Sequence, residues 1–485
     1  VSDVECVPPA DAFPLSSALE PGATTTGLYN SVSSFEYADR ERSHVHLADF
    51  YGSWDSPEEN VVTARALPRK PTGIYNVATR ERSEVFLYGG DPPSGLDAQV
   101  VKLDLESGEE VWSHTLDVSD EVFSWPGVVT AHGNGDVYAV HGVRLARLDA
   151  DTGSVIASVE LPAPDGVLQS DTIYNGFNVT TNGLLVVKSL SRPAGCTAQG
   201  LNVPSQCADV GPFPPSLLST VDPETLEVLG SVEMPEMILT RLAISKFEGS
   251  EWVYMGALND AVYRVRVEDS GALTLDTWVY QGFSAEGQPG STEVVVMGDW
   301  IVFQTTGGFG SVPMAVHVVS QADPAVFASL EPFDLGPSGI SLFPGSLSAD
   351  PATLRIYALD GGRGQIGCLQ LVEGIDGPEL TRLWVVDQTT LNLVSLIGPE
   401  DARVLVSTDA PQALMGLAGE SDYDESVVWR SAETGEELAR SEALPAMGIG
   451  LSVNPGFSGT ILYPASDGTL YEVSARGATP VCEED

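Results

Sequence analysis

A hairpin element that recurs along the chain constrains the fold more than any other feature of the sequence. It reads LDLESGEEVW at 103–112 and LDADTGSVIA at 148–157, and it returns in weaker form at 221–230 and 430–439. In its fullest form an apolar run ends at Asp, a Ser/Thr-Gly pair follows, and a second apolar run begins. Asp can accept backbone N–H bonds in a turn and Gly can take a positive φ, so each copy predicts a tight turn between two antiparallel strands.

Short β-rich runs fill the sequence between these hairpins. Examples are GDVYAV, GLLVVKSL, WIVFQT, LRIYAL and TILYPA, each bounded by turn-forming residues. Amphipathic helical stretches are nearly missing. Four short strands per period of about 50 residues, repeated this often, predict an all-β fold, a single β-propeller of four-stranded antiparallel blades. The expected starts of the repeat units are residues 26, 72, 126, 172, 239, 291, 340, 391 and 448.

The number of blades does not follow directly from these nine starts. The last unit, from residue 448, has sequence for only three strands, and the first unit, 26–67, is also one strand short. Either one of them is not a full blade, or the two ends of the chain share one blade. We expect eight blades, with seven and nine as alternatives. We expect an N-terminal extension at 1–25, the propeller at 26–476 with an insertion at 191–215, and a C-terminal tail at 477–485.

The hairpin element resembles the blade repeats of the PQQ-like, or quinoprotein-type, propellers, which carry a similar Asp-x-x-Thr-Gly-x-x-x-Trp turn. The resemblance covers roughly 70–475 and is most specific at Asp104, Gly108, Trp112, Asp149 and Gly153. It implies a propeller and, for the dehydrogenases of this family, a PQQ cofactor beside a disulfide of adjacent cysteines, with a Ca²⁺ ion and an Asp base. This sequence has no adjacent cysteines and no CxxCH haem motif, so the resemblance favours the fold over the dehydrogenase activity.

The five cysteines indicate an oxidising compartment. Cys196 and Cys207 bracket a polar loop whose length suits a disulfide. Cys6 and Cys482 lie near the two chain ends, which a ring-shaped fold would bring together, so we expect a second disulfide there. Cys368 is left over and is expected to be buried as a small apolar residue. Because disulfides persist outside the cytosol, and the start VSDVECVPP is typical of a trimmed leader, we expect an exported protein: periplasmic, envelope-anchored or extracellular.

The composition is strongly acidic, with a formal net charge of −45. Such a surface repels phosphate backbones and anionic lipid head groups, so nucleic acid is not an expected partner. Such a charge is compatible with an environment of high salt or one rich in divalent cations. The alternative is that the charge only keeps the surface well solvated. No apolar run reaches the ~20 residues that span a bilayer, so no transmembrane segment is expected.

Two histidines form the first candidate site, for a metal ion. The stretch ADRERSHVHL matches the later stretch ATRERSEVFL, and it has His44 and His46 where the second copy has Glu84 and Phe86. On a strand, residues i and i+2 share a face, so this pair with Asp49 nearby could ligate a metal. Phe86 in the sister copy favours the alternative, a face that packs within the fold.

Three Tyr-Asn pairs form the second candidate site, for a ligand. They fall at the expected starts of innermost strands, whose ends meet the loops at the mouth of a propeller channel. Hydroxyl and amide groups placed there could bind a ligand; alternatively, each Tyr packs between blades and each Asn makes a turn. The residues are Tyr29, Asn30, Tyr75, Asn76, Tyr174 and Asn175.

Three functional classes follow from these observations, and the sequence leaves open whether the chain is an enzyme. The favoured class is an exported, non-catalytic propeller that presents a binding face to a protein or small-molecule partner, because no GxSxG, HExxH, Walker A or GxGxxG motif is present. The alternative is a calcium-dependent propeller hydrolase of the lactonase or esterase type, with Ca²⁺ in the channel and a His or carboxylate base. A PQQ-type dehydrogenase, which the resemblance would imply, ranks third.

Overall fold

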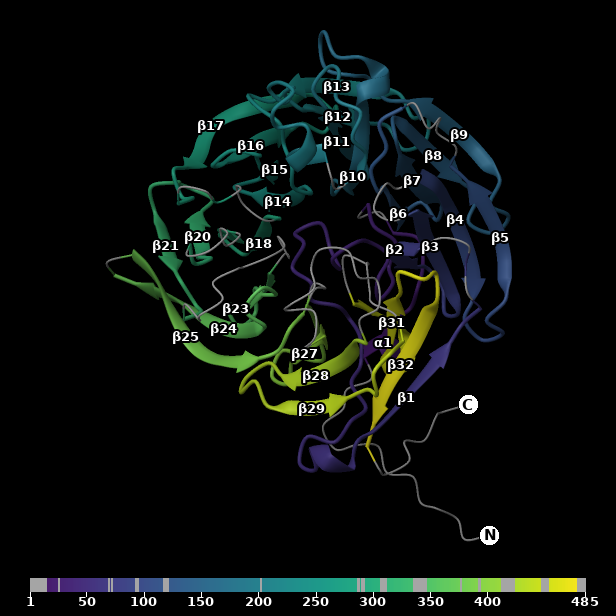
Figure 1. Ribbon diagram of the computed structural model, residues 1–485, viewed down its shortest axis with the longest axis vertical. Coiled ribbons are helices and arrows are strands. Elements are labelled where there is room, and N and C mark those ends of the chain that lie inside the picture. Colours follow the sequence, from purple (N-terminus) through teal and green to yellow (C-terminus); the bar gives the residue numbers. More distant parts are fainter. Residues whose placement is uncertain are drawn as a thin grey trace.

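The chain forms a ring of eight four-stranded antiparallel sheets, the blades of a β-propeller (Figure 1). In seven blades, four consecutive strands follow one another from the axis to the rim. The all-β class and the count of eight blades are therefore confirmed. This computed structural model describes residues 15–24, 27–68, 70, 73–91, 96–116, 122–200, 203–285, 288, 293–305, 312–334, 347–375, 377–390, 394–410, 424–445 and 453–477.

The blades are numbered in chain order, each from its innermost strand. Blades 1 and 2 consist of β2 (Gly73–Thr79), β3 (Glu84–Asp91), β4 (Leu96–Asp104) and β5 (Glu110–Thr115), then β6 (Val128–Ala131), β7 (Val137–His141), β8 (Arg144–Leu148) and β9 (Val155–Glu160). Blades 3 and 4 consist of β10 (Thr172–Val179), β11 (Leu185–Ser191), β12 (Leu217–Val221) and β13 (Val228–Glu233), then β14 (Ala243–Phe247), β15 (Ser250–Gly256), β16 (Ala261–Val267) and β17 (Leu273–Gln281).

The other half of the ring repeats this pattern. Blades 5 and 6 consist of β18 (Val295–Met297), β19 (Trp300–Gln304), β20 (Val316–Ser320) and β21 (Phe327–Leu330), then β22 (Ser348–Asp350), β23 (Arg355–Asp360), β24 (Gln365–Gly374) and β25 (Gly377–Asp387). Blade 7 consists of β26 (Ser395–Ile397), β27 (Val404–Asp409), β28 (Ser426–Ser431) and β29 (Glu437–Arg440). The short helices are α1 (Leu15–Ala18), α2 (Val203–Gln206), η1 (Pro57–Glu59), η2 (Gln169–Asp171) and η5 (Phe457–Gly459).

Blade 8 is built from both halves of the chain and closes the ring. Its inner strands are β30 (Asn454–Pro455), β31 (Thr460–Pro464) and β32 (Leu470–Arg476), and its outermost strand is β1 (Val61–Ala66). β1 runs antiparallel to β32. This sharing explains the nine expected starts, because the unit expected at 26–67 is not a blade and supplies the strand that the last unit lacks.

Turn glycines dock neighbouring blades against each other. The Trp112 indole of β5 donates to the carbonyl of Ala150 in blade 2, at 3.1 Å. Gly153 in the same turn has φ +70°, and a Cβ there would lie 2.6 Å from the Trp112 ring. Between blades 6 and 7, Gly435 has φ +77° and would place a Cβ 2.8 Å from the Trp384 ring. The Asp-x-x-Thr-Gly element is therefore a hairpin turn and also a docking surface for the preceding blade.

Residues 27–50, which we call the axial plug, lie inside the ring of innermost strands (Figure 1). The innermost strands of blades 1, 2, 4, 5, 6 and 7 each donate a backbone N–H to a carbonyl of the plug. This satisfies donors that would otherwise face the axis without a strand partner. The donor–acceptor pairs are Thr79 to Ser33 (2.8 Å), Ala131 to Ser34 (2.9 Å), Ile244 to Arg40 (2.7 Å), Val296 to Glu41 (2.8 Å), Ala349 to Ser43 (3.1 Å) and Leu396 to His44 (2.8 Å).

The two remaining blades reach the plug through side chains. In blade 3 the Asn178 amide donates to the carbonyl of Arg40 at 2.9 Å. In blade 8 the carbonyl of Pro455 accepts a hydrogen bond from the Ser33 hydroxyl at 2.6 Å. All eight blades are therefore tied to one segment of a dozen residues, 33–44.

The plug lies towards the face where each first strand turns into the second, which we call the plug face. Thr79 and Ala131 are the last residues of β2 and β6, and the other four donors lie within three residues of the ends of their strands. Since the strands of a blade are antiparallel, the connections from second to third strands and from one blade to the next leave from the opposite face, which we call the loop face.

The docking role of Gly153 gives a stability prediction. Gly153→Ala places a Cβ against Trp112 in a left-handed backbone, so the free energy of unfolding should fall by about 3 kcal/mol or more. Gly135 is a matched control, because it also has a positive φ (+97°) but an added Cβ would meet no atom within 4 Å. Gly135→Ala should cost about 1–2 kcal/mol. Urea denaturation measures both, and equal losses would contradict the docking role.

Candidate functional site

Buried charged side chains meet at the channel axis, between the plug and blades 3 to 5. The carboxylate of Glu36 lies 3.4 Å from Nη1 of Arg42 and 3.3 Å from Nε of Arg241. Nε of Arg241 is also 3.9 Å from a carboxylate oxygen of Glu293. The side chains of Glu36 and Arg42 are fully buried, and that of Arg241 is 5% exposed. We call the following residues the axial cluster: Glu36, Tyr37, Arg42, Lys188, Arg241 and Glu293.

Tyr37 is held in this cluster by its ring. The ring stacks on that of His44, with centroids 4.8 Å apart, and the Arg42 guanidinium lies 4.7 Å from its centroid. Burial and the nearby carboxylates of Glu293 and Glu36 raise the pKa of Tyr37 well above its ordinary value. The hydroxyl therefore keeps its proton and remains a hydrogen-bond donor.

Lys188, on β11, places an amine in the same low-dielectric region. Its Nζ donates to the carbonyls of Ile238 and Leu239, at 2.8 and 3.2 Å. Burial, together with repulsion from Arg241, holds the pKa of Lys188 well below its ordinary value. Burial likewise raises the pKa of Glu293. The cluster thus weakens the charged form of both a base and an acid.

The histidines of the first candidate site lie in the plug and not on a strand, so the expected strand was wrong there. His44 has φ 63°, in the left-handed region. Its Nδ1 lies 2.9 Å from the carbonyl of Val394, and Nδ1 of His46 lies 3.0 Å from the carbonyl of Val32. Both rings are almost completely buried. His44 therefore anchors the plug to the segment before β26, and His46 holds two parts of the plug together.

Asp49 faces a different set of partners. Its carboxylate accepts hydrogen bonds from the backbone N–H of Ser16, at 2.9 Å, and from the Tyr51 hydroxyl, at 3.0 Å. Within the described part of the chain, no group of three or more His, Cys, Asp and Glu side chains is placed to hold a metal ion. The metal site stays a prediction that this geometry does not support.

Two of the three Tyr-Asn pairs lie on innermost strands, as expected. The Tyr75 and Tyr174 hydroxyls donate to backbone carbonyls, at 3.3 and 2.6 Å. The Asn76 side chain accepts a hydrogen bond from the backbone N–H of Val129 at 3.0 Å, which ties blade 1 to blade 2. Asn175 is buried, and its Oδ1 has no hydrogen-bond partner. A ligand role for these pairs stays a prediction.

The third pair lies elsewhere. Tyr29 and Asn30 belong to the plug and not to an innermost strand, so their expected position was wrong. The Tyr29 hydroxyl donates to the Glu81 carboxylate, and the Asn30 amide donates to the carbonyl of Glu20 at 2.7 Å. These contacts hold the N-terminal segment against the turn between β2 and β3.

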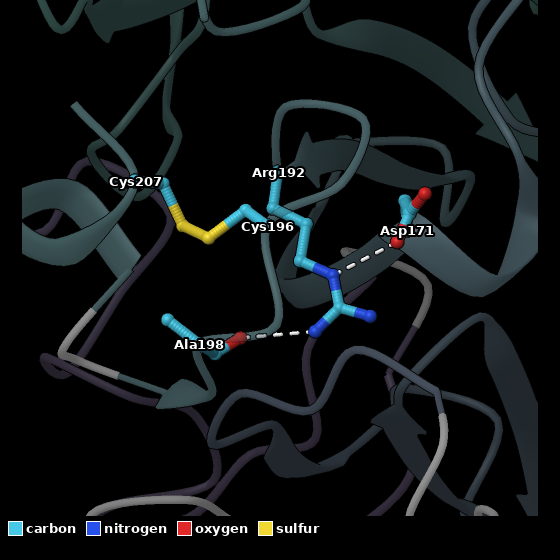
Figure 2. The surroundings of a disulfide bond; sticks show 5 residues. All are labelled: Asp171, Arg192, Cys196, Ala198 and Cys207. Carbon is cyan, nitrogen blue, oxygen red and sulfur yellow. Dashed lines mark hydrogen bonds and ion pairs between the residues drawn. A yellow bond between two sulfur atoms is a disulfide. The ribbon is translucent and has the colours of Figure 1, made fainter. Parts of the chain in front are cut away.

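The predicted disulfide between Cys196 and Cys207 is confirmed (Figure 2). It lies in the β11–β12 connection, which leaves from the loop face. Beside it the Arg192 guanidinium binds the Asp171 carboxylate at 2.8 Å and the carbonyl of Ala198 at 3.0 Å. These contacts tie the β11–β12 connection to the connection that precedes β10. The leftover cysteine, Cys368, is free and buried as expected. The other predicted pair lies outside the described residues: Cys6 and Cys482.

Sequence reasoning did not find the axial cluster. Lys188 is the one member that the sequence could have indicated, because it is one of few lysines and lies inside the apolar run GLLVVKSL. Glu36, Arg241 and Glu293 lie far apart in the sequence and have no shared motif. Only the closed ring and the plug bring them together.

Comparison with solved structures identifies the fold. The quinohemoprotein alcohol dehydrogenase from Comamonas testosteroni matches with a TM-score of 0.58 and 10% identity, over 92% of this chain and 81% of that one. A europium-containing methanol dehydrogenase matches with a TM-score of 0.57 and 9% identity, over 94% and 90%. The Dos1 propeller matches with a TM-score of 0.51 and 11% identity, over 86% and 98%. The chain therefore has the eight-bladed fold of the PQQ-type dehydrogenases, as its hairpin repeats indicated.

At these identities the likeness shows the fold alone. No protein-family model matches the sequence. A search of curated proteins finds no match either. No helix among the described residues is long and apolar enough to cross a membrane.

The buried histidines of the plug predict a pH dependence of stability. Burial lowers the pKa of His44 to about 3 and that of His46 to about 4. The unfolded chain binds these protons near pH 6.5, so the stabilisation is complete above that pH and is lost as the pH falls towards 4. His46→Gln removes one of the two imidazoles that bind these protons. As the pH is lowered from 6 to 4, the free energy of unfolding of the variant should therefore fall less steeply than that of the parent. The two slopes should differ by up to about 1.4 kcal/mol per pH unit.

Urea denaturation over a pH series measures this difference. The comparison with the parent is needed because Glu41, whose pKa burial raises to about 7, acts in the opposite sense over the same range. Identical pH slopes for parent and variant would show that His46 titrates normally in the folded chain.

Proposed function

We propose that this chain is an exported, non-catalytic propeller that binds a protein partner on its loop face. The observation that carries the proposal is the axial plug. The chain's own residues lie inside the ring at the plug face, and they take hydrogen bonds there from six innermost strands among the described residues. That arrangement leaves the loop face as the end of the ring at which the connections between strands can meet a partner.

The disulfide supports export. The bridge between Cys196 and Cys207 stabilises a connection on the loop face. Such bonds persist mainly in oxidising compartments. A cross-linked connection also loses less conformational entropy when it binds.

Two exposed apolar side chains on the loop face support a protein partner. Leu168, before β10, is 64% exposed, and Val210, in the β11–β12 connection, is 48% exposed. Asp165 and Asp209 are exposed close to them in the sequence. The contact between Arg192 and the β10 connection ties both segments together. Apolar side chains beside carboxylates, on a chain of net charge −45, suit a partner with apolar residues flanked by basic ones.

The proposal is tested by introducing negative charges on the loop face and, as a control, on the rim of blade 2. Leu168→Glu with Val210→Glu should weaken the partner's binding at least tenfold, about 1.4 kcal/mol. The matched control is Val155→Glu with Ile156→Glu on the rim strand β9, where the side chains are 46% and 48% exposed. The partner is isolated by cross-linking in the exported fraction of source cells, purified, and its affinity is measured for each variant at low and high salt.

Two outcomes would contradict the proposal. One is an equal loss of affinity in the rim control, which would show that the loop face has no special role. The other is one Ca²⁺ per purified chain together with hydrolysis of an ester or lactone, which would establish the calcium-dependent hydrolase instead.

A further inference from the structure

Two guanidinium groups of the axial cluster each have a buried N–H group without a hydrogen-bond partner. These atoms are Nη2 of Arg42 and Nη1 of Arg241. Nε of Arg42 donates to the carbonyl of Leu242, and both guanidinium groups form ion pairs with Glu36. The open donors therefore belong to side chains that are otherwise fixed in place.

An unpaired guanidinium donor in a dry interior is costly. Arginine stays charged at any ordinary pH, so it cannot relieve the cost by losing a proton. A buried charged donor without an acceptor loses more free energy than a neutral one. These two donors therefore indicate that an acceptor outside the chain occupies the space beside them.

The two guanidinium groups that carry these donors flank one carboxylate. Arg42 and Arg241 approach the two oxygens of a single carboxylate, that of Glu36, at 3.4 and 3.3 Å. The Tyr37 hydroxyl, which lies beside Arg241 and Glu293, also has no hydrogen bond of good geometry. The two open N–H groups and this hydroxyl therefore belong to side chains that surround Glu36.

Gly176 completes this arrangement. A Cβ at this residue would lie 2.6 Å from Nη1 of Arg241 and 3.2 Å from its Cζ. The guanidinium therefore lies directly over the backbone of β10, where only glycine leaves room for it. This packing fixes the direction in which the open Nη1 points.

The local charge favours an anion as the acceptor. Two arginines, Arg42 and Arg241, stand against two carboxylates, Glu36 and Glu293, while burial weakens the charged form of Lys188. Burial also weakens the charged form of Glu293, which leaves the arginines less compensated. Water would supply an acceptor but no charge.

We propose that the axial cluster binds one small monovalent anion, held by Nη2 of Arg42, Nη1 of Arg241 and the Tyr37 hydroxyl. The anion joins the plug to blade 4, because Arg42 comes from the plug and Arg241 precedes β14. It is a structural ligand of the ring, and it is independent of the proposed partner on the loop face. Chloride and a small carboxylate such as acetate share the required chemistry.

The test is the thermal unfolding midpoint of the full chain at constant ionic strength. Chloride or acetate replaces gluconate, an anion too large for a site formed by these contacts. A ligand of the folded state should raise the midpoint by about 1 °C for each tenfold rise in its concentration above the dissociation constant. The effective anion identifies the ligand: chloride alone indicates a halide site, and acetate alone a carboxylate site. A midpoint that does not respond to either anion would overturn the proposal.

Two variants localise the effect. Tyr37→Phe removes one donor and keeps the ring, so it should reduce the response to the anion. Tyr357→Phe is the matched control, because its hydroxyl is also buried without a good hydrogen bond, but in blade 6; its anion response should equal that of the parent. Gly176→Ala should displace the Arg241 guanidinium and abolish the response. Should this variant fail to fold, the two tyrosine variants still decide the outcome, and an unchanged response in Tyr37→Phe would overturn the assignment.

Crystals grown in bromide give a direct readout. An anomalous peak between Arg42 and Arg241 is expected. Water alone at that position, in the parent protein and at high bromide, would show that no anion is bound.

Discussion

The innermost strand of each blade leaves backbone N–H groups facing the channel axis, and the ring depends on how these groups are satisfied. Here the acceptors are carbonyls of one irregular segment, residues 33–44, which six of these strands reach within the described part of the chain. A regular strand could not serve all of them, because its carbonyls alternate between two directions. The plug turns instead, with Tyr37, Ala38, Arg42 and His44 at positive φ. The cost of that backbone is offset by hydrogen bonds around the ring.

Much of the fold could be predicted because its determinants are local. Asp, Thr and Gly at fixed spacing in 148–157 define a turn, and the apolar runs on either side define strands. Eight of the nine expected starts fall within eight residues of an innermost strand, from β2 to β30. The ninth failed for a physical reason: strand β1, in the unit at 26–67, pairs with β32 at the other end of the chain, and no local signal shows that partner.

The site could not be predicted in the same way. The stretches ADRERSHVHL and ATRERSEVFL are alike in sequence, yet the first is buried plug and the second includes a hairpin turn followed by β3. What separates them is the set of strands that surrounds the first, which is a tertiary property. The axial cluster has the same origin, because Glu36, Arg241 and Glu293 meet only after the ring closes around the plug. The sequence shows a pair of histidines, but it does not show that both are buried and bonded to backbone carbonyls.

Hydrogen exchange at six backbone amides tests the central claim most directly. These are the N–H groups that donate to the plug: Thr79, Ala131, Ile244, Val296, Ala349 and Leu396. If the plug satisfies them, they should exchange as slowly as amides in the middle strands of the blades, through opening of the whole ring. Fast exchange at these amides, with the middle strands still protected, would show that they are bonded to water in the channel and not to the plug.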